Sequence, residues 1–391
     1  MFWFSIVCAL NGLVAYASPT YANRTVSTGG ISALYTMTNN APNNLVAYPV
    51  YHETQLGNPK SFYTGGNGGV SRNSTSGGIG VPALVSGHSI VVSANHIFNV
   101  NAGSNSITMF EIAKNDSTLL RRIGVFDTPG DFPVTIAIRN STICVGHSGS
   151  RPGVSCAEWN TEGISEFDDL RTVIKETHRP SLPDSNFGSS VLTDLLFTSD
   201  GSNLVASVSG YYTESQTGEN MVRSWLVEPS GQVATEGTIL STGNHSFAFS
   251  GTVIAGTSKI FLTDPKFGGY TVDAQAPASP AALAEVEGAE AACWAQIDPR
   301  SGLAYITDDV RNLIVAVDPK TGKTVRTVKP KGNATGYVDF EIVGHYMYTL
   351  VNRNELAGQI AVLDLDVDEP SGQEYPIVGS VGHSQGLAVY G

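Results

Sequence analysis

A short β-rich run that ends in small or polar residues recurs seven times along this chain. The copies fall about fifty residues apart, a spacing typical of propeller blades. Most are followed by a second run in which apolar and polar residues alternate, as at 106–112, 312–318 and 359–364. Alternation with a period of two, bounded by turn residues, indicates half-buried strands. The seven copies are residues 34–39, 97–103, 143–147, 204–210, 260–264, 304–308 and 347–352.

These repeats predict an all-β fold, a seven-bladed β-propeller with four-stranded antiparallel blades. The turns agree, because residues 199–202, 229–231 and 319–322 carry hairpin chemistry. The ring must also close. The last strand-like run, 385–390, is expected to form the inner strand of the blade whose outer strands come from 31–51. Such pairing of the N- and C-terminal strands would leave no open edge.

No linker divides the chain, so residues 31–391 are expected to form a single propeller domain. Two segments break the repeat. Residues 64–80 are rich in Gly, Ser and Asn, which favours a surface loop. Residues 160–180 are expected to form a short helix or an extra crossing.

The first seventeen residues carry no charged side chain and end in Ala15-Tyr16-Ala17, a small-x-small cleavage pattern. This stretch is too short to span a bilayer, which takes about 20 apolar residues, and no later stretch comes close. We therefore expect a signal peptide at 1–17, an N-terminal extension at 18–30, and a protein secreted to the cell exterior or the cell wall, with no membrane span. The alternative is that the first stretch forms a buried strand.

Sequons and cysteines support an oxidising, exported setting. Cys144 and Cys156 are close in sequence, and a glycine-rich turn between them could bring them into bonding range as a disulfide. Cys293 is then the odd cysteine and is expected to be a buried inert thiol. Six Asn-x-Ser/Thr sequons together indicate a glycoprotein. They are Asn23, Asn73, Asn115, Asn140, Asn244 and Asn333.

Composition excludes some classes of function. The chain of 391 residues is 41% hydrophobic, enough for a large core, so general disorder is excluded. Its net charge of −13 argues against nucleic acid as a partner, because phosphate binding needs clustered Lys and Arg. No pair of histidines has metal-ligand spacing with a third partner nearby, so we expect neither a metal nor a cofactor.

Three stretches resemble the seven-bladed lactonase family, which includes propeller 6-phosphogluconolactonases and fungal carboxymuconate-lactonizing enzymes, also called carboxymuconate cyclases. The stretches are 99–107, 292–294 and 385–388, and the last two look like a secreted fungal branch of that group. The resemblance covers most of 31–391. It implies a propeller without a catalytic metal, in which His, Arg and Glu side chains on inner strands and their loops act on an acidic lactone or muconate.

The sequence departs from that family where its chemistry resides. The family's enzymes carry a Pro-His step on an inner strand and arginines that converge on substrate carboxylates. The comparable stretch here, 187–194, has neither. Arginine is also missing from the other presumed inner strands, 132–137, 245–250, 292–297 and 336–342. Because Arg binds carboxylates in a bidentate way, the resemblance transfers the fold and not the catalytic residues.

Polar side chains on or beside the presumed inner strands could still converge on an axial channel. Asp194 and Asp339 are the best candidates for a catalytic general base. His147 ends a repeat strand and could transfer a proton, or bind an anion together with Arg151. The structural alternative is that such groups bond to channel water, neighbouring blades or loop backbone. The remaining ligand-binding candidates are His245, Asp264, Trp294, Gln296 and Gln385.

Two motif matches are given structural interpretations. Residues 382–386 read Gly-His-Ser-Gln-Gly, but only five residues follow this G-x-S-x-G match and none is a histidine that could serve as the base. Residues 364–368 resemble the start of a calcium loop, but Glu369 stands where the loop needs Gly. We expect the first to lead into the closing strand and the second to be a solvated strand end.

Two functions remain. The first is a secreted, non-catalytic or weakly catalytic propeller that binds a cell-wall glycan or a protein through its loops, which the sequons, the acidic charge and the missing arginines favour. The second is a metal-independent lactonase or muconate cycloisomerase that acts on a small acidic ligand in the channel, using channel carboxylates and His147. Only the family resemblance favours the second. In either case we expect a monomer.

Overall fold

The computed structural model describes residues 30–70, 83–173, 190–210, 212–213, 216–217, 220–243, 245, 247–279, 282–332, 336–351 and 358–391. The predicted signal peptide, nearly all of the predicted extension, and the sequons Asn23, Asn73, Asn244 and Asn333 lie outside these residues. Within the described ranges, no helix has the length and apolar character needed to cross a membrane.

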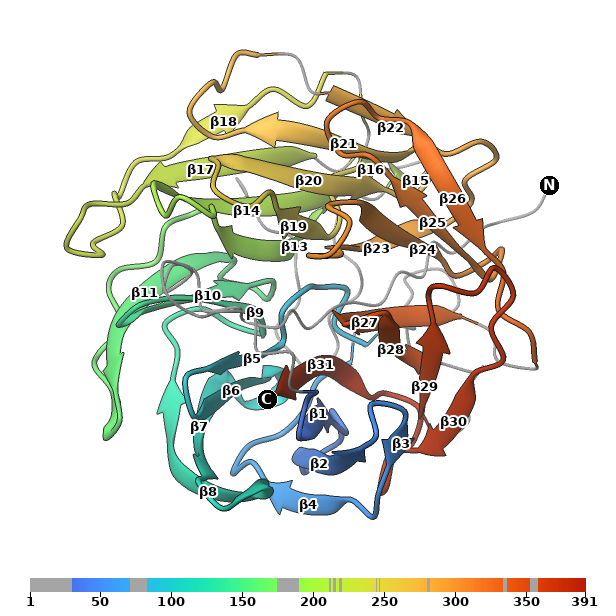
Figure 1. Ribbon diagram of the computed structural model, residues 1–391. Coiled ribbons are helices and arrows are strands. Elements are labelled where there is room, and N and C mark those ends of the chain that lie inside the picture. Colours follow the sequence, from blue (N-terminus) through green and yellow to red (C-terminus); the bar gives the residue numbers. More distant parts are fainter. Residues whose placement is uncertain are drawn as a thin grey trace.

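Seven antiparallel sheets are arranged around a central axis, so the predicted seven-bladed β-propeller is confirmed (Figure 1). Each blade is named here by its inner strand, the strand nearest the axis. In six of the blades the chain runs outward from the inner strand, and consecutive strands pair as antiparallel neighbours. Each inner strand also contacts the inner strands of the two adjacent blades.

The strands of these six blades have the following bounds. The β5 blade contains β5 (Ile90–Ser93), β6 (His96–Asn101), β7 (Ser106–Ala113) and β8 (Asp116–Asp127). The β9 blade contains β9 (Pro133–Arg139), β10 (Thr142–His147), β11 (Gly153–Asn160) and β12 (Gly163–Ile164). The β13 blade contains β13 (Ser190–Phe197), β14 (Asn203–Gly210), β17 (Met221–Leu226) and β18 (Thr238–Leu240). The β19 blade contains β19 (Gly251–Val253), β20 (Lys259–Asp264), β21 (Gly268–Asp273) and β22 (Ala282–Glu285). The β23 blade contains β23 (Ala292–Ile297), β24 (Ala304–Asp308), β25 (Leu313–Val317) and β26 (Thr324–Val328). The β27 blade contains β27 (Tyr337–Val343), β28 (Tyr346–Val351), β29 (Gln359–Asp364) and β30 (Gln373–Pro376). A small hairpin, β15 (Tyr212–Thr213) with β16 (Gln216–Thr217), and a short 3-10 turn, η2 (Ala102–Ser104), complete the described elements.

The ring closes as predicted, by pairing of the two ends of the domain. In the β31 blade, β31 (Gln385–Tyr390) pairs antiparallel with β1 (Ala33–Met37). β1 pairs in turn with β2 (Asn44–Tyr51), which carries β3 (Gln55–Leu56) and β4 (Lys60–Tyr63) on its outer side. Leu387, Ala388 and Val389 are buried, so apolar packing as well as backbone pairing holds this closure.

The seven repeated runs of the sequence form the second strand of every blade, namely β1, β6, β10, β14, β20, β24 and β28. Their side chains are buried on both faces, because each blade packs against two neighbours. Trp225 and Trp294 are the largest fully buried side chains in the described part of the chain. The core of the protein is therefore divided among the interfaces between blades.

The cysteines are arranged almost as expected. Cys144 and Cys156 lie opposite each other on β10 and β11 and form the predicted disulfide, with their Cα atoms 4.0 Å apart. Cys293 is fully buried in β23. No described cysteine is free, so the expectation of a thiol at Cys293 is wrong.

The two segments that break the repeat are described in part. Residues 64–70 form a loop that packs between the β31 and β5 blades, where the Thr64 hydroxyl bonds to Asn101. Residues 160–173 contain the outer strand β12 and an isolated bridge from Arg171 to Val154, with no helix in this described stretch. Residues 71–80 and 174–180 lie outside the described ranges.

Candidate functional site

β-bulges near the start of the inner strands set the direction in which several of the candidate side chains point. Register shifts between first and second strands occur in five of the seven blades. A bulge changes the direction of a side chain and is common beside functional sites. Asp194 follows the bulge in β13, and buried Asp339 occupies the bulge in β27 at a φ of 22°. The β19 and β23 blades separate these two aspartates.

Asp194 is buried and bonded on both carboxylate oxygens. Its Oδ1 lies 2.5 Å from His88 Nδ1 and accepts a hydrogen bond of 2.8 Å from the Leu195 N–H. Its Oδ2 accepts a hydrogen bond of 2.8 Å from the Gly251 N–H at the start of β19. Asp194 therefore connects its own blade to the next one, and both of its oxygens already accept hydrogen bonds from the protein.

Two further inter-blade connections continue around the ring. The Gln296 Nε2 on β23 donates to Glu341 Oε2 on β27 at 2.8 Å, and its Oε1 accepts from the Ile342 N–H at 2.5 Å. The Thr252 hydroxyl oxygen on β19 accepts a hydrogen bond from the Ile297 N–H on β23 at 3.2 Å. Polar side chains on neighbouring inner strands thus form hydrogen bonds between blades, which is the structural alternative that the sequence left open.

A segment between β4 and β5, residues 83–89, lies in the middle of the ring, where Figure 1 shows it in light blue between β9 and β27. We call it the axial segment. The Ser86 hydroxyl and the His88 carbonyl bond to β9, and the Gly87 N–H bonds to the Thr193 carbonyl of β13. Val85 is 1% exposed and shares an apolar cluster with Trp294. The axial segment therefore occupies the space into which inner-strand side chains would otherwise project.

Close packing of the axial segment requires Gly87. A Cβ atom at this position would lie 2.5 Å from the Asp194 carboxylate, well inside contact distance. His88 takes up a left-handed conformation, with a φ of 56°, and its side chain is 4% exposed. Its Nε2 is buried and has no hydrogen-bond partner among the described residues. Asp194 and His88 thus form a buried dyad with one unused nitrogen.

His147 and Arg151 bond to different partners. His147 is fully buried at the end of β10, and its Nδ1 lies 3.2 Å from the Gly153 carbonyl oxygen. Burial lowers the pKa of His147 to about 4, so this side chain is neutral at physiological pH. Arg151 is exposed and forms an ion pair of 2.9 Å with Asp131. The structure thus contains a buried neutral His and a paired surface Arg in place of a joint anion site.

The remaining candidates are buried or nearly so. His245 stacks on the Tyr270 ring at 5.0 Å, and its Nδ1 lies 3.8 Å from Asp264 Oδ2. Trp294 packs edge-on against Phe249 within the apolar cluster of the axial segment. Gln385 begins the closing strand and is 1% exposed. His245 and Asp264 are thus near each other, on a different blade from the dyad of Asp194 and His88.

The two motif matches have the structural roles expected of them. Ser384 immediately precedes β31, is 2% exposed, and donates a hydrogen bond of 2.7 Å to Ser380. No described helix follows it, as a nucleophile elbow would require. In the calcium-like stretch, Asp364 and Asp366 group with His345, and their ligand atoms lie within 4.8 Å of one another. His345 already bonds to Asp364 at 2.9 Å, and Arg300 pairs with Asp366 at 3.4 Å.

Sequence reasoning missed His88, Glu341 and Asp309. A signal for His88 is present, because the tripeptide Gly-His-Ser occurs at 87–89, 146–148 and 382–384, and two of these copies directly precede an inner strand. Half-buried Asp309 follows β24, where burial and its neighbour Asp308 raise its pKa to about 8. Nothing in the local sequence around Asp309 or Glu341 distinguishes them from other strand and turn carboxylates.

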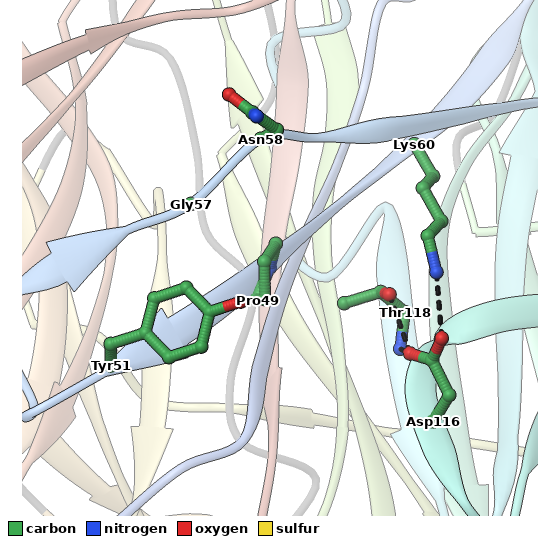
Figure 2. Close-up of a pocket in the computed structure, with 7 residues that line it drawn as sticks. All are labelled: Pro49, Tyr51, Gly57, Asn58, Lys60, Asp116 and Thr118. Atoms are coloured by element: carbon green, nitrogen blue, oxygen red, sulfur yellow. Dashed lines mark hydrogen bonds and ion pairs between the residues drawn. The ribbon is translucent and has the colours of Figure 1, made fainter.

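A separate groove of about 540 Å³ lies on the outer side of the ring, between the β31 and β5 blades. Figure 2 shows Tyr51 and Pro49 on one side of it and the pair formed by Lys60 and Asp116 on the other. The Lys60 Nζ lies 2.6 Å from Asp116 Oδ2, and bonds from Lys60 and Thr118 lower the pKa of Asp116 to about 2. Gly57, Asn58 and Thr118 complete the lining.

Comparison with solved structures finds many propellers with the same fold. The periplasmic gluconolactonase of Pseudomonas aeruginosa superposes with a TM-score of 0.62 at 14% identity, covering 92% of this chain and 99% of that one. A protein of Bacteroides fragilis, provisionally assigned as a 6-phosphogluconolactonase, gives a TM-score of 0.59 at 13% identity, with coverage of 94% and 100%. A protein of Desulfotomaculum acetoxidans of unknown function gives 0.61 at 8%, with coverage of 92% and 99%.

At such low identities these likenesses show the seven-bladed propeller fold and nothing finer. No known family profile matches the sequence, and no curated protein matches it at a significant level. The expected relationship to carboxymuconate cyclases stays a prediction from sequence resemblance.

Proposed function

We propose that this protein is a secreted glycoprotein whose propeller works as a non-catalytic binding module. One observation carries the proposal: the axial segment occupies the centre of the ring and uses Asp194 as its anchor. A carboxylate that accepts three hydrogen bonds from the protein is poorly placed to act as a general base. Arg121 and Arg151 are exposed and pair with Glu111 and Asp131, neither of which lies on an inner strand.

Surface features support the extracellular part of the proposal. The sequons Asn115 and Asn140 lie exposed in turns, where an oligosaccharyltransferase could reach them. A disulfide between β10 and β11 is consistent with an oxidising compartment. The predicted signal peptide remains part of the proposal on its sequence pattern alone.

The test is a turnover assay on the purified secreted protein. Substrates are glucono-1,5-lactone, 6-phosphogluconolactone and 3-carboxymuconate, with Asp194→Ala and His147→Ala as comparison variants. We expect the wild-type rate to equal the uncatalysed rate for all three. A wild-type rate well above background for any of the three substrates would overturn the proposal.

The second candidate function, a lactonase, is favoured by the dyad of Asp194 and His88. A carboxylate that holds His Nδ1 fixes the tautomer and leaves Nε2 as the base, the arrangement that activates water or a hydroxyl in many hydrolases. Here Nε2 is buried without a hydrogen-bond partner among the described residues. If the protein hydrolyses lactones, His88→Ala should reduce kcat by about 10²-fold or more, whereas the exposed variant His52→Ala should not change it.

A further inference from the structure

The groove between the β31 and β5 blades has the chemistry of a carbohydrate site. Tyr51 is 54% exposed at the end of β2. Gly57 lies directly against its ring and against Pro49. A Cβ on Gly57 would lie 2.6 Å from the Tyr51 ring, so a larger residue at position 57 would displace the ring. An exposed aromatic ring gives a flat apolar platform for the face of a sugar.

The opposite wall offers hydrogen-bonding groups of both kinds. The Lys60 ammonium carries donors, the Asp116 carboxylate carries acceptors, and the Asn58 amide carries both. Side-chain exposures of 45% for Lys60 and 44% for Asp116 leave each partly open to the groove. Sugar hydroxyls act as donor and acceptor at once, so a wall with paired donors and acceptors suits them.

Charge decides between classes of ligand. Lys60 is already neutralised by Asp116 at 2.6 Å, so the groove presents no unpaired charge to an anion or a cation. The whole chain carries a net charge of −13, which further disfavours an acidic ligand. The volume of about 540 Å³ falls within the range of small-molecule sites, roughly 300–1,000 Å³. These observations leave a neutral, polyhydroxylated ligand a few sugar units long.

We propose that the groove lined by Tyr51, Asn58, Lys60 and Asp116 binds a neutral oligosaccharide. Tyr51 stacks against one sugar face. Asn58 and the ion pair of Lys60 and Asp116 bind the hydroxyls. The inference rests on the proposed function, since it gives the binding module a site and a class of ligand.

The test is calorimetric titration of the intact glycoprotein with defined tetrasaccharides. The probes are the neutral chitotetraose, laminaritetraose and mannotetraose, and the acidic tetragalacturonate. We expect at least one neutral probe to bind and the acidic probe to bind at least tenfold more weakly. Tyr51→Ala should weaken neutral binding at least tenfold. The matched control is Tyr63→Ala, which removes an exposed tyrosine of the neighbouring strand β4 outside the groove and should leave affinity unchanged.

A charge-changing variant sharpens the test. Asp116→Asn leaves the Lys60 ammonium unpaired, so it should weaken the neutral probe and at least partly restore binding of tetragalacturonate. The inference is overturned if no neutral probe binds, if Tyr51→Ala binds as well as wild type, or if wild type prefers the acidic probe. Sugar binding that is unchanged in Tyr51→Ala would show that the sugar binds outside this groove, and it would still be consistent with a binding module. Lactone turnover would refute the proposed function, and the titrations would then decide separately whether the groove binds a sugar.

Discussion

Asp194 has the position of a catalytic residue and the contacts of a structural one. Its place on an inner strand is that of a catalytic base, and its hydrogen bonds are those of a structural anchor. Three donors from three parts of the chain, His88, Leu195 and Gly251, converge on its two oxygens. A buried carboxylate is tolerated when it is bonded in this way, and its removal then leaves several donors unsatisfied.

Replacing Asp194 should therefore destabilise the protein strongly. In Asp194→Ala, the His88 ring and two backbone N–H groups lose their acceptor, and each buried unsatisfied group costs about 1–3 kcal/mol. We expect the free energy of unfolding to fall by about 3–5 kcal/mol, measured by urea denaturation. Asp127→Ala, an exposed strand-end control, should change it by less than about 0.5 kcal/mol. A loss below about 1 kcal/mol at Asp194 would argue that its bonds are weak and leave the base role open.

His147 gives the protein a pH-dependent stability. Its pKa is lowered from the ordinary 6.5 to about 4 by burial, so between these values the unfolded chain binds a proton that the folded chain does not. Acidification through this window therefore favours unfolding. Between pH 7 and pH 5, wild type should lose about 2 kcal/mol more stability than His147→Asn, which cannot titrate. Urea denaturation of both proteins at the two pH values gives this difference directly, and parallel losses would show that His147 has the same pKa in the folded and unfolded states.

Sequence patterning placed most strands correctly and was insufficient for the contacts of these residues. The presumed inner strand 245–250 is wrong, because the inner strand of that blade is β19, Gly251–Val253. Alternation placed 292–297 and 385–390 on inner strands, and both match β23 and β31. It could not pair Asp194 with His88, because 106 residues separate them and His88 sits in a left-handed loop position. Likewise, the burial of His147 depends on the loops of its blade folding over it, which no local pattern encodes.

At the scale of elements, the axial segment fills the middle of the ring. Its backbone bonds to β9 and β13 and its side chains join the apolar cluster of the ring. The sequence around it, Ala83-Leu84-Val85-Ser86-Gly87, was not assigned to any repeat strand, and a loop of this length would ordinarily lie on the surface. It is buried here because its polar backbone groups find partners on two inner strands.

Adding a single methyl group at position 87 tests how tightly the axial segment is packed. Gly87→Ala places a Cβ against the Asp194 carboxylate, so the axial segment must shift and the bond from His88 must lengthen. We expect a loss of about 1–3 kcal/mol and faster amide exchange at position 87 and at Ile136, measured by hydrogen exchange. Gly30→Ala is the matched control, because its Cβ would meet only the flexible side chain of Glu53. Equal exchange in both variants would mean that the axial segment is loosely held.

At the scale of the whole molecule, the ring turns seven marginal sheets into one cooperative unit. No single blade buries both of its faces, so each depends on its neighbours and the last depends on closure. The inter-blade bonds of Asp194, Thr252 and Gln296 connect four consecutive inner strands, which explains why polar residues are retained on them. The same bonds therefore contribute to the stability of the ring.

Closure by β31 should consequently be essential to the fold. Deleting residues 385–391 removes the inner strand of one blade, exposes the edge of β1 and uncovers apolar residues of the two flanking blades. We expect the truncated chain to lose cooperative thermal unfolding by circular dichroism and to aggregate, because an unpaired apolar edge recruits other chains.

A circular permutant separates loss of closure from loss of connectivity. Gly391 lies against Gly30 and Ile31, so a short linker can join these ends while new ones open in the exposed turn at 229–231. The permutant keeps every strand pair and should unfold within a few degrees of wild type, whereas a truncated chain that stays monomeric and folded would show that six blades suffice.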